Sequence, residues 1–189
     1  MYIDPVAHLT LINSAVYGNQ APDSIGGGLT NRGELLIESS YIYDNLAYQG
    51  GGIYNDGGYL EVNNSEIFTN TALDSGGGVF NDTTMFISND SYIYDNAAAY
   101  GGGVAISGNG AVFSQTVGSL GGNTAFEGGG VYVFEGSIAM NNGEIVNNVA
   151  SGNGGGVYLY NPTATLTAEE SSIATNRACL LYTSPSPRD

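Results

Sequence analysis

Triple glycines recur along the chain at a nearly constant interval, and this interval limits the possible folds more than any other feature. They begin at Gly26, Gly50, Gly76, Gly101, Gly128 and Gly154, at spacings of 24, 26, 25, 27 and 26 residues. A fixed period of this length is typical of a solenoid, in which each repeat packs only on its neighbours. We therefore expect a stack of similar rungs.

Two further elements repeat in the same register. The motif S-x-[IVL]-x-x-N-x-A occurs at residues 14–21, 40–47, 65–72, 91–98 and 171–178, and with Gly in place of Ser at 118–125 and 143–150. A third element alternates apolar and variable residues, which is the period of a strand. Its apolar pairs are Leu9/Leu11, Leu35/Ile37, Leu60/Val62, Met85/Ile87, Ile138/Met140 and Leu166/Ala168. Each repeat thus contains three short extended segments, and none has a helical period.

These segments predict an all-β fold, a right-handed parallel β-helix (solenoid) of about seven rungs with three short strands per rung. Stacking places each inward Ile, Leu or Val on its equivalent about 4.8 Å away, and parallel connections are right-handed in nearly all proteins. We expect the β-helix to span residues 1–178. The fifth rung is expected to be the least regular. Phe113 and Leu120 are seven residues apart, whereas the equivalent apolar residues are five apart in five of the other rungs. Two extra residues would bulge outward there.

The Asn of the second motif is the most regular polar position in the chain. Asn tolerates positive φ at a tight turn, and stacked amides can hydrogen-bond from rung to rung. We expect a structural ladder rather than a calcium or sugar site, because a ligand site has no need to repeat on every rung. The ladder residues are Asn19, Asn45, Asn70, Asn96, Asn123, Asn148 and Asn176. The glycines are interpreted as bend and close-approach positions, since they lead into strands rather than into a phosphate-binding helix.

The composition is strongly acidic, and the last residues break the repeat. There are 18 acidic residues against three basic ones, a formal net charge of −15, so no nucleic acid partner is expected. No apolar run is long enough for membrane insertion. Residues 179–189 (CLLYTSPSPRD) resemble a translated sequencing adapter, and we expect an artefactual or disordered tail. The natural chain is expected to continue beyond Ala178 into further rungs or domains.

The repeats resemble those of the polymorphic outer-membrane proteins, which are autotransporter adhesins with G-G-A-[ILV] and F-x-x-N motifs. The likeness extends from Leu9 to Ala178. Gly occupies the Ala place at Gly28, Gly52, Gly78, Gly103, Gly130 and Gly156, and an aliphatic residue occupies the Phe place, as at Ile42. The resemblance implies a surface-displayed or secreted passenger segment with a structural and adhesive role. The implied location is extracellular or at a bacterial cell surface.

The alternative is a carbohydrate-active enzyme, because polysaccharide lyases and hydrolases also use parallel β-helices. A lyase would want carboxylates beside a basic residue, but Arg32 and Arg177 lie about six rungs apart. A hydrolase needs two carboxyl groups roughly 5 to 9.5 Å apart, and Asp44 and Asp95 lie two rungs apart with Thr69 between them. Ser–His–Asp catalysis is not expected, because it would depend on His8 alone, in the incomplete first rung. We expect no catalytic residue, no cofactor and no metal, since no ligand cluster has metal-binding spacing.

Aromatic residues are the best candidates for a binding surface. Alternation about the inward Ile points Tyr41, Tyr43, Phe68, Tyr92 and Tyr94 outward, with Tyr17 before them. A second row follows the glycines at Tyr54, Phe80, Tyr132 and Tyr158. Such rows either form a platform for a glycan or a host-surface protein, or stack on one another and stabilise the sheet.

Overall fold

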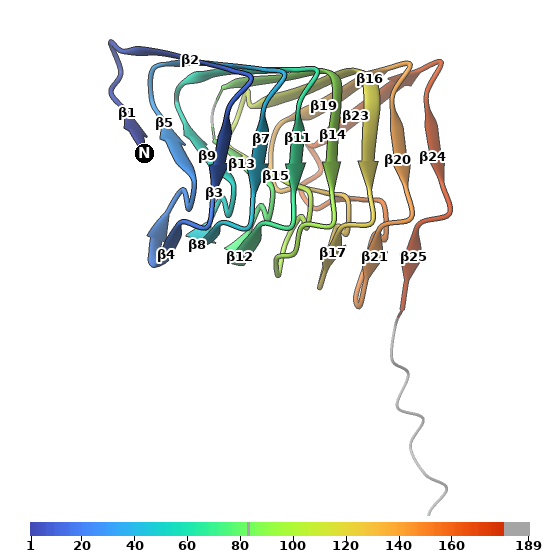
Figure 1. Cartoon of the computed structure of the whole chain (residues 1–189). Helices are drawn as coiled ribbons and strands as arrows, with labels where there is room; N and C mark the ends of the chain where they lie inside the picture. Colours follow the sequence, from blue (N-terminus) through green and yellow to red (C-terminus); the bar gives the residue numbers. More distant parts are fainter. Residues whose placement is uncertain (83, 180–189) are drawn as a thin grey trace, which may run out of the picture.

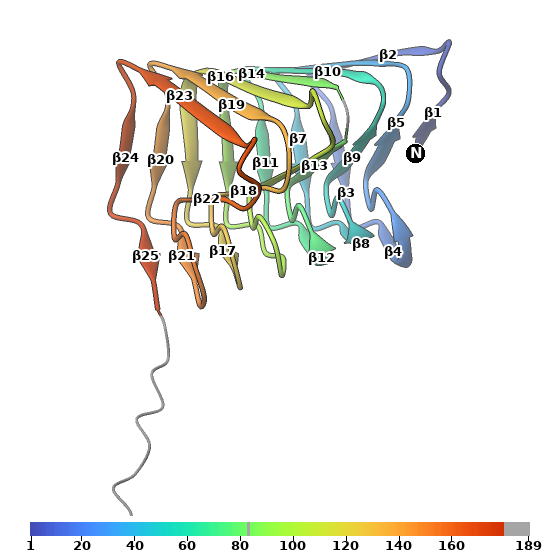
Figure 2. The same ribbon diagram turned by 180° about the vertical axis from the view of Figure 1, so that it is seen from behind.

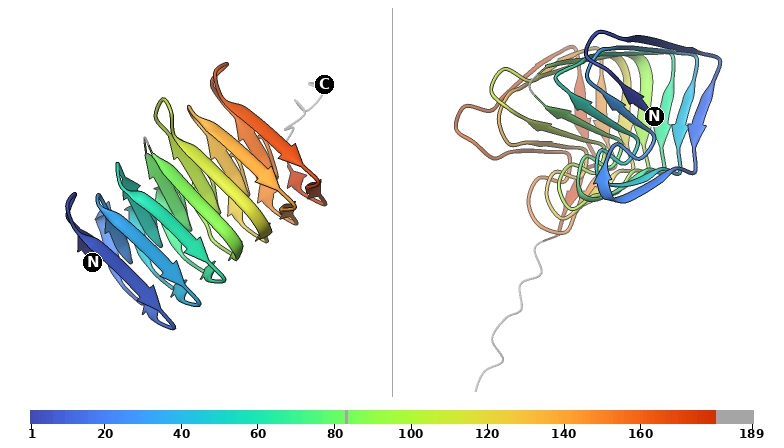
Figure 3. Two further views of the ribbon diagram at one scale, coloured as in Figure 1. Left: turned by 90° about the horizontal axis from the view of Figure 1, so that it is seen from above. Right: turned by 90° about the vertical axis from the view of Figure 1, so that its left-hand side faces the viewer.

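The chain folds into a right-handed parallel β-helix of about seven turns, as the repeat predicted (Figure 1). The computed structural model describes residues 1–82 and 84–179, and within these ranges it contains strands, turns and bends but no helix. Every strand pair is parallel. Seen from above, equivalent strands follow one another in chain order along the axis (Figure 3).

One wall of the coil is a seven-stranded sheet that takes one strand from each turn. Its order along the axis is β1-β5-β9-β13-β15-β18-β22, and several of these strands are visible in succession from behind (Figure 2). The strands are β1 (Tyr2–Ile3), β5 (Leu29–Asn31), β9 (Ile53–Asp56), β13 (Val79–Asp82), β15 (Val104–Ser107), β18 (Val131–Val133) and β22 (Val157–Leu159).

The other two walls form one twelve-stranded sheet, because β14 (Met85–Tyr94) and β16 (Val112–Gly121) run through both. The second wall otherwise holds β2 (His8–Ile12), β6 (Glu34–Glu38), β10 (Tyr59–Asn63), β19 (Ser137–Asn141) and β23 (Thr165–Glu169). The third wall otherwise holds β3 (Ala15–Tyr17), β7 (Tyr41–Tyr43), β11 (Glu66–Phe68), β20 (Glu144–Val146) and β24 (Ser172–Ala174).

A fourth set of short strands follows the third wall and makes two small sheets. Isolated bridges at Ala97 and Tyr100 connect these sheets across the fourth turn. The strands are β4 (Gln20–Ile25), β8 (Leu46–Gln49), β12 (Thr71–Ser75), β17 (Thr124–Ala125), β21 (Val149–Ala150) and β25 (Arg177–Ala178).

The core is a set of apolar columns that run along the axis inside the three walls. Ile42, Ile67 and Ile93 pair in register on the third wall and are fully buried. On the second wall Phe86 stacks on Phe113 with ring centroids 4.8 Å apart. Since burial of one such side chain contributes about 1.5–3 kcal/mol, stacking converts weak single rungs into a stable core.

Residues at positive φ turn the chain at each corner. The corner between the second and third walls uses Asn13, Ser39, Asn64, Asp90, Val117, Asn142 and Glu170. The corner after the third wall uses Gly18, Asp44, Thr69, Asp95, Gly122, Asn147 and Thr175. Thr69, Val117 and Thr175 are β-branched, and a β-branched residue in this region is strained; Val117 (φ 57°) is the apolar one of the three.

The first two glycines of each triplet have distinct roles. The first, such as Gly76 (φ 68°), adopts a left-handed conformation. The second faces the next turn: a Cβ on Gly77 would lie 2.3 Å from the carbonyl oxygen of Gly102. Both functions require a residue without a side chain.

The register of the fourth rung differs from the sequence prediction. Phe86 and Ser88 pair with the inward residues Leu60 and Val62, so Phe86 and Ser88 also point inward, whereas Met85 is exposed. The predicted inward pair Met85/Ile87 is therefore wrong by one residue, because both alternations fit the local pattern.

The predicted bulge between Phe113 and Leu120 is also wrong. Phe113 pairs with Phe86 and Leu120 with Ile93 without a shift, so the seven-residue step is the ordinary one. The two extra residues of this rung lie before β16, where Ile106 and Val112 are six residues apart and the equivalent Asn81 and Met85 are four. The inward position after Phe113 is occupied by Gln115, which hid the register in the sequence.

The prediction for the tail concerns residues 179–189, of which all but Cys179 lie outside the described residues. The Cys179 amide donates to the Ala150 carbonyl at 2.9 Å.

Candidate functional site

The seven Asn residues of the repeat line one corner and are joined by side-chain hydrogen bonds. Each Nδ2 donates to the Oδ1 of the Asn in the next rung, at 2.8 to 3.1 Å along the series from Asn19 to Asn176. The amide of Asn70 also receives two bonds from Asn45 and donates to the Ile42 carbonyl. This Asn ladder satisfies backbone groups that the turn leaves unpaired.

One detail of the predicted ladder is wrong. The positive φ belongs to the preceding residue, such as Asp44 or Thr69, and not to the Asn. The Asn therefore contributes its amide and not its backbone tolerance.

A second, shorter Asn ladder was missed in the sequence. Asn31 donates to Asn55 and Asn55 to Asn81, both at 2.8 Å, inside the seven-stranded sheet. The next equivalents are Ile106 and Val133. The signal was an Asn two residues after the aliphatic that follows the glycines, present in only three rungs.

The predicted aromatic surface lies on the third wall and separates into two groups. Tyr43, Phe68 and Tyr94 stack with Tyr17 in one column, with ring centroids 4.9 to 5.1 Å apart. The Tyr94 hydroxyl donates to Glu66 at 2.7 Å, and burial together with this bond raises the Tyr94 pKa. This column thus holds the sheet together.

Tyr41 and Tyr92 form the second group, which faces solvent. Each is 47% exposed, and both pair with Glu66, which lies between them on β11. A shallow pocket of about 230 Å³ beside Tyr92 is lined by the strained Val117 and by Asn142. Exposed aromatics beside a strained apolar residue are typical of an interaction surface.

The acidic residues singled out in the sequence lie at exposed positions. Asp44 and Asp95 occupy the same corner with Thr69 between them, and the Thr69 hydroxyl donates to Asp44 at 2.7 Å. His8 contacts Glu34 at 2.6 Å.

A charged group that sequence reasoning missed lies on the seven-stranded sheet. Arg32 forms an ion pair with Asp56 at 2.6 Å, and Asp56 pairs in register with Asp82. Burial, and then the charge of Asp56, raises the pKa of Asp82. Arg32, Asp56 and Asp82 each lie three residues after the aliphatic residue that follows the glycines. This shared position predicts that they are neighbours only once the strand register is known.

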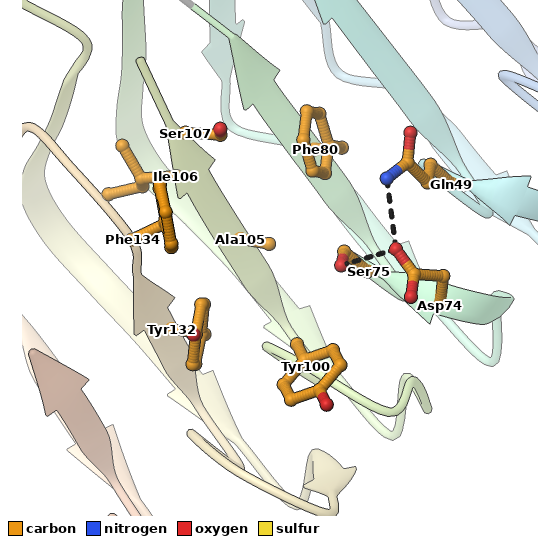
Figure 4. A pocket seen from close by; sticks show the side chains of 10 residues that line it. All are labelled: Gln49, Asp74, Ser75, Phe80, Tyr100, Ala105, Ile106, Ser107, Tyr132 and Phe134. Atoms are coloured by element: carbon orange, nitrogen blue, oxygen red, sulfur yellow. Dashed lines mark hydrogen bonds between the residues drawn. The ribbon is translucent and has the colours of Figure 1, made fainter. Parts of the chain in front are cut away.

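A notch lies over Ala105 on the outer face of the same sheet (Figure 4). Tyr54 and Phe80 stack with centroids 4.9 Å apart, and Ala105 follows Phe80 in the register before Tyr132. The aromatic row is therefore interrupted by one small residue. The notch has a volume of about 320 Å³, within the range of small-molecule sites.

The notch has aromatic sides and an acidic rim. Phe80 lies on one side and Tyr132 and Phe134 lie on the other, while Tyr100 comes from the same rung as Ala105 (Figure 4). Asp74 stands at the rim, where its Oδ2 accepts hydrogen bonds from Gln49 and Ser75, each 2.9 Å long.

The electrostatic surroundings of the notch are negative. Burial, followed by the charge of Glu127, raises the pKa of Tyr132 to about 12. In the described part of the chain the ion pairs are His8–Glu34 and Arg32–Asp56, so Asp74 has no basic partner.

Within residues 1–82 and 84–179, no three His, Cys, Asp or Glu side chains gather as metal ligands, and no helix is long and apolar enough to span a membrane. Comparisons of the chain with protein-family models, with curated proteins and with solved structures found no match.

Proposed function

We propose that this chain is a rigid segment of a surface-displayed or secreted protein with a structural and adhesive role. The observation that carries the proposal is the pair of exposed tyrosines, Tyr41 and Tyr92, held in fixed register beside Glu66. The Asn ladder and the Tyr17–Tyr94 column give this face a fixed backing. Tyrosines on a rigid support bind partners with little loss of conformational entropy.

The partner proposed for this face is a glycan or a host-surface protein, as the resemblance to autotransporter adhesins implies. The polar rim of Glu66, Asn142 and Glu144 would hydrogen-bond such a partner, while Tyr92 and Val117 would contact its apolar parts. The extracellular location rests on the same resemblance, and labelling of intact cells of the source organism with an antibody to this segment tests it.

The binding role is tested with a double variant, Tyr41→Ser with Tyr92→Ser, on a glycan array and on a panel of immobilised surface proteins. The matched control is Tyr48→Ser, because Tyr48 is 48% exposed but belongs to β8 outside this face. We expect the double variant to lose binding at least tenfold and the control to retain it. Equal loss in both would show that the face is not the binding surface.

Catalysis on carbohydrate is the second candidate, because Asp56 and Asp82 occupy adjacent strands beside Arg32. Adjacent strands place equivalent residues about 4.8 Å apart, close to the separation of two carboxyl groups in retaining glycosidases. Release of reducing sugar from a polysaccharide panel, abolished by either Asp56→Asn or Asp82→Asn, would favour the enzyme over the adhesive segment.

A further inference from the structure

The notch over Ala105 lies where the aromatic row of the seven-stranded sheet lacks a ring. Phe80 and Tyr132 flank Ala105 on neighbouring strands, so their backbones are two strand spacings, about 9.6 Å, apart. The Tyr100 ring also lines the notch and lies 5.2 Å from the Tyr132 ring, at an interplanar angle of 53°. A cation is attracted to an aromatic ring face over roughly 6 Å, so a cation that occupies the notch would be attracted to the rings that line it.

The polar atoms at the rim favour a cation over a neutral sugar. The Gln49 amide and the Ser75 hydroxyl both donate to Asp74, so these donors are directed to the carboxylate and not to a ligand. Asp74 has no basic partner among the described residues. The net charge of −15 adds a long-range attraction for cations and repels phosphates.

We propose that this notch binds a quaternary ammonium group, carried on a molecule without a neighbouring phosphate. The methyl groups would contact Phe80, Tyr132 and Phe134, and the positive charge would face Asp74 (Figure 4). The site lies on β13, β15 and β18, on a different wall from Tyr41 and Tyr92. Ligand binding in the notch can therefore be tested separately from the adhesive surface proposed above.

The direct test measures the affinity of choline by titration calorimetry, beside its uncharged isostere 3,3-dimethylbutan-1-ol. We expect saturable binding of choline in the millimolar range or tighter and at least tenfold weaker binding of the isostere, because only the charge differs. Trimethyl-lysine amide and phosphocholine distinguish the carriers, and phosphocholine is expected to bind more weakly. Equal affinity for the isostere would overturn the proposal, as would the absence of saturable choline binding.

Ala105→Tyr is the sharpest variant, because it fills the notch with the ring that equivalent positions already carry at Tyr54 and Tyr132. It should abolish choline binding and keep or raise the melting temperature. Choline binding that survives Ala105→Tyr would refute this location.

Asp74→Asn, which keeps the shape of the rim, should weaken choline binding about tenfold. Phe68→Ala serves as the control, since it removes an aromatic ring from another wall and should leave the affinity within about twofold. A neutral sugar that binds in place of choline and is blocked by Ala105→Tyr would keep the site but reject its proposed ligand.

Discussion

Replacing Asn70 by Ala tests whether the Asn ladder stabilises the β-helix as its geometry implies. Asn70 is fully buried, and its side chain makes four hydrogen bonds: two from Asn45 and one each to Ile42 and Asn96. Each contributes about 1 kcal/mol net, so we expect a loss of about 4 kcal/mol in the free energy of unfolding. For a chain of this length that corresponds to a fall in melting temperature of roughly 8–16 °C.

The matched control is Asn19→Ala at the exposed end of the same ladder. Asn19 donates only to Tyr17 and Asn45, and water can replace these bonds, so its loss should cost about 1 kcal/mol or less. Urea unfolding followed by circular dichroism measures both variants. Equal costs for Asn70→Ala and Asn19→Ala would refute the reasoning, because the ladder would then stabilise independently of burial.

Four further predictions concern single positions and are measured by thermal unfolding. Gly77→Ala should destabilise by more than about 2 kcal/mol, because its Cβ would meet a carbonyl oxygen 2.3 Å away, whereas Gly121→Ala, whose nearest contact is 3.5 Å away, should change little. Val117→Asn should raise stability by about 1 kcal/mol by relieving the strain at φ 57°, and no gain would argue against strain. Gln115→Met should also stabilise, by roughly 1–3 kcal/mol, because both amide atoms of Gln115 are buried without a partner; a loss would indicate that they are satisfied. The pKa of Asp82 is raised in the folded state, so its ionisation opposes folding: Asp82→Asn should be more stable than the natural chain at pH 7, with a difference that shrinks as the pH falls towards 3.8, and a difference independent of pH would contradict this.

The sequence predicted the coil, its three walls and the position of the ladder Asn, because these follow from spacings that recur in every rung. It failed where one rung departs from the pattern. Met85 and Phe86 both begin an apolar alternation. Only the constant seven-residue distance to the inward residue of the third wall, as from Phe86 to Ile93, distinguishes them. Gln115 stands where an apolar residue was expected, so the two extra residues were predicted after Phe113 and not before Val112 in the same rung.

The candidate sites were less predictable for a related reason. The aromatic row was visible at Tyr54, Phe80, Tyr132 and Tyr158, but the small Ala105 has no polar, charged or aromatic group that would mark a site in the sequence. A hollow forms where larger side chains surround a small one. Asp74 lines the same hollow from a different sheet. Such proximity depends on how walls meet at a corner, which repeat spacing alone does not encode.

The pairing of each strand only with its equivalents one turn before and after it has a mechanical consequence. Partners such as Leu60 and Phe86 are 26 residues apart. A pull on one end of the coil would therefore load the backbone hydrogen bonds of the terminal turn first. Each detached turn would release a chain of about 25 residues, roughly 85 Å when extended, in exchange for about 4.8 Å of coil. The coil would therefore lengthen under tension in nearly equal steps, and each step would dissipate mechanical energy.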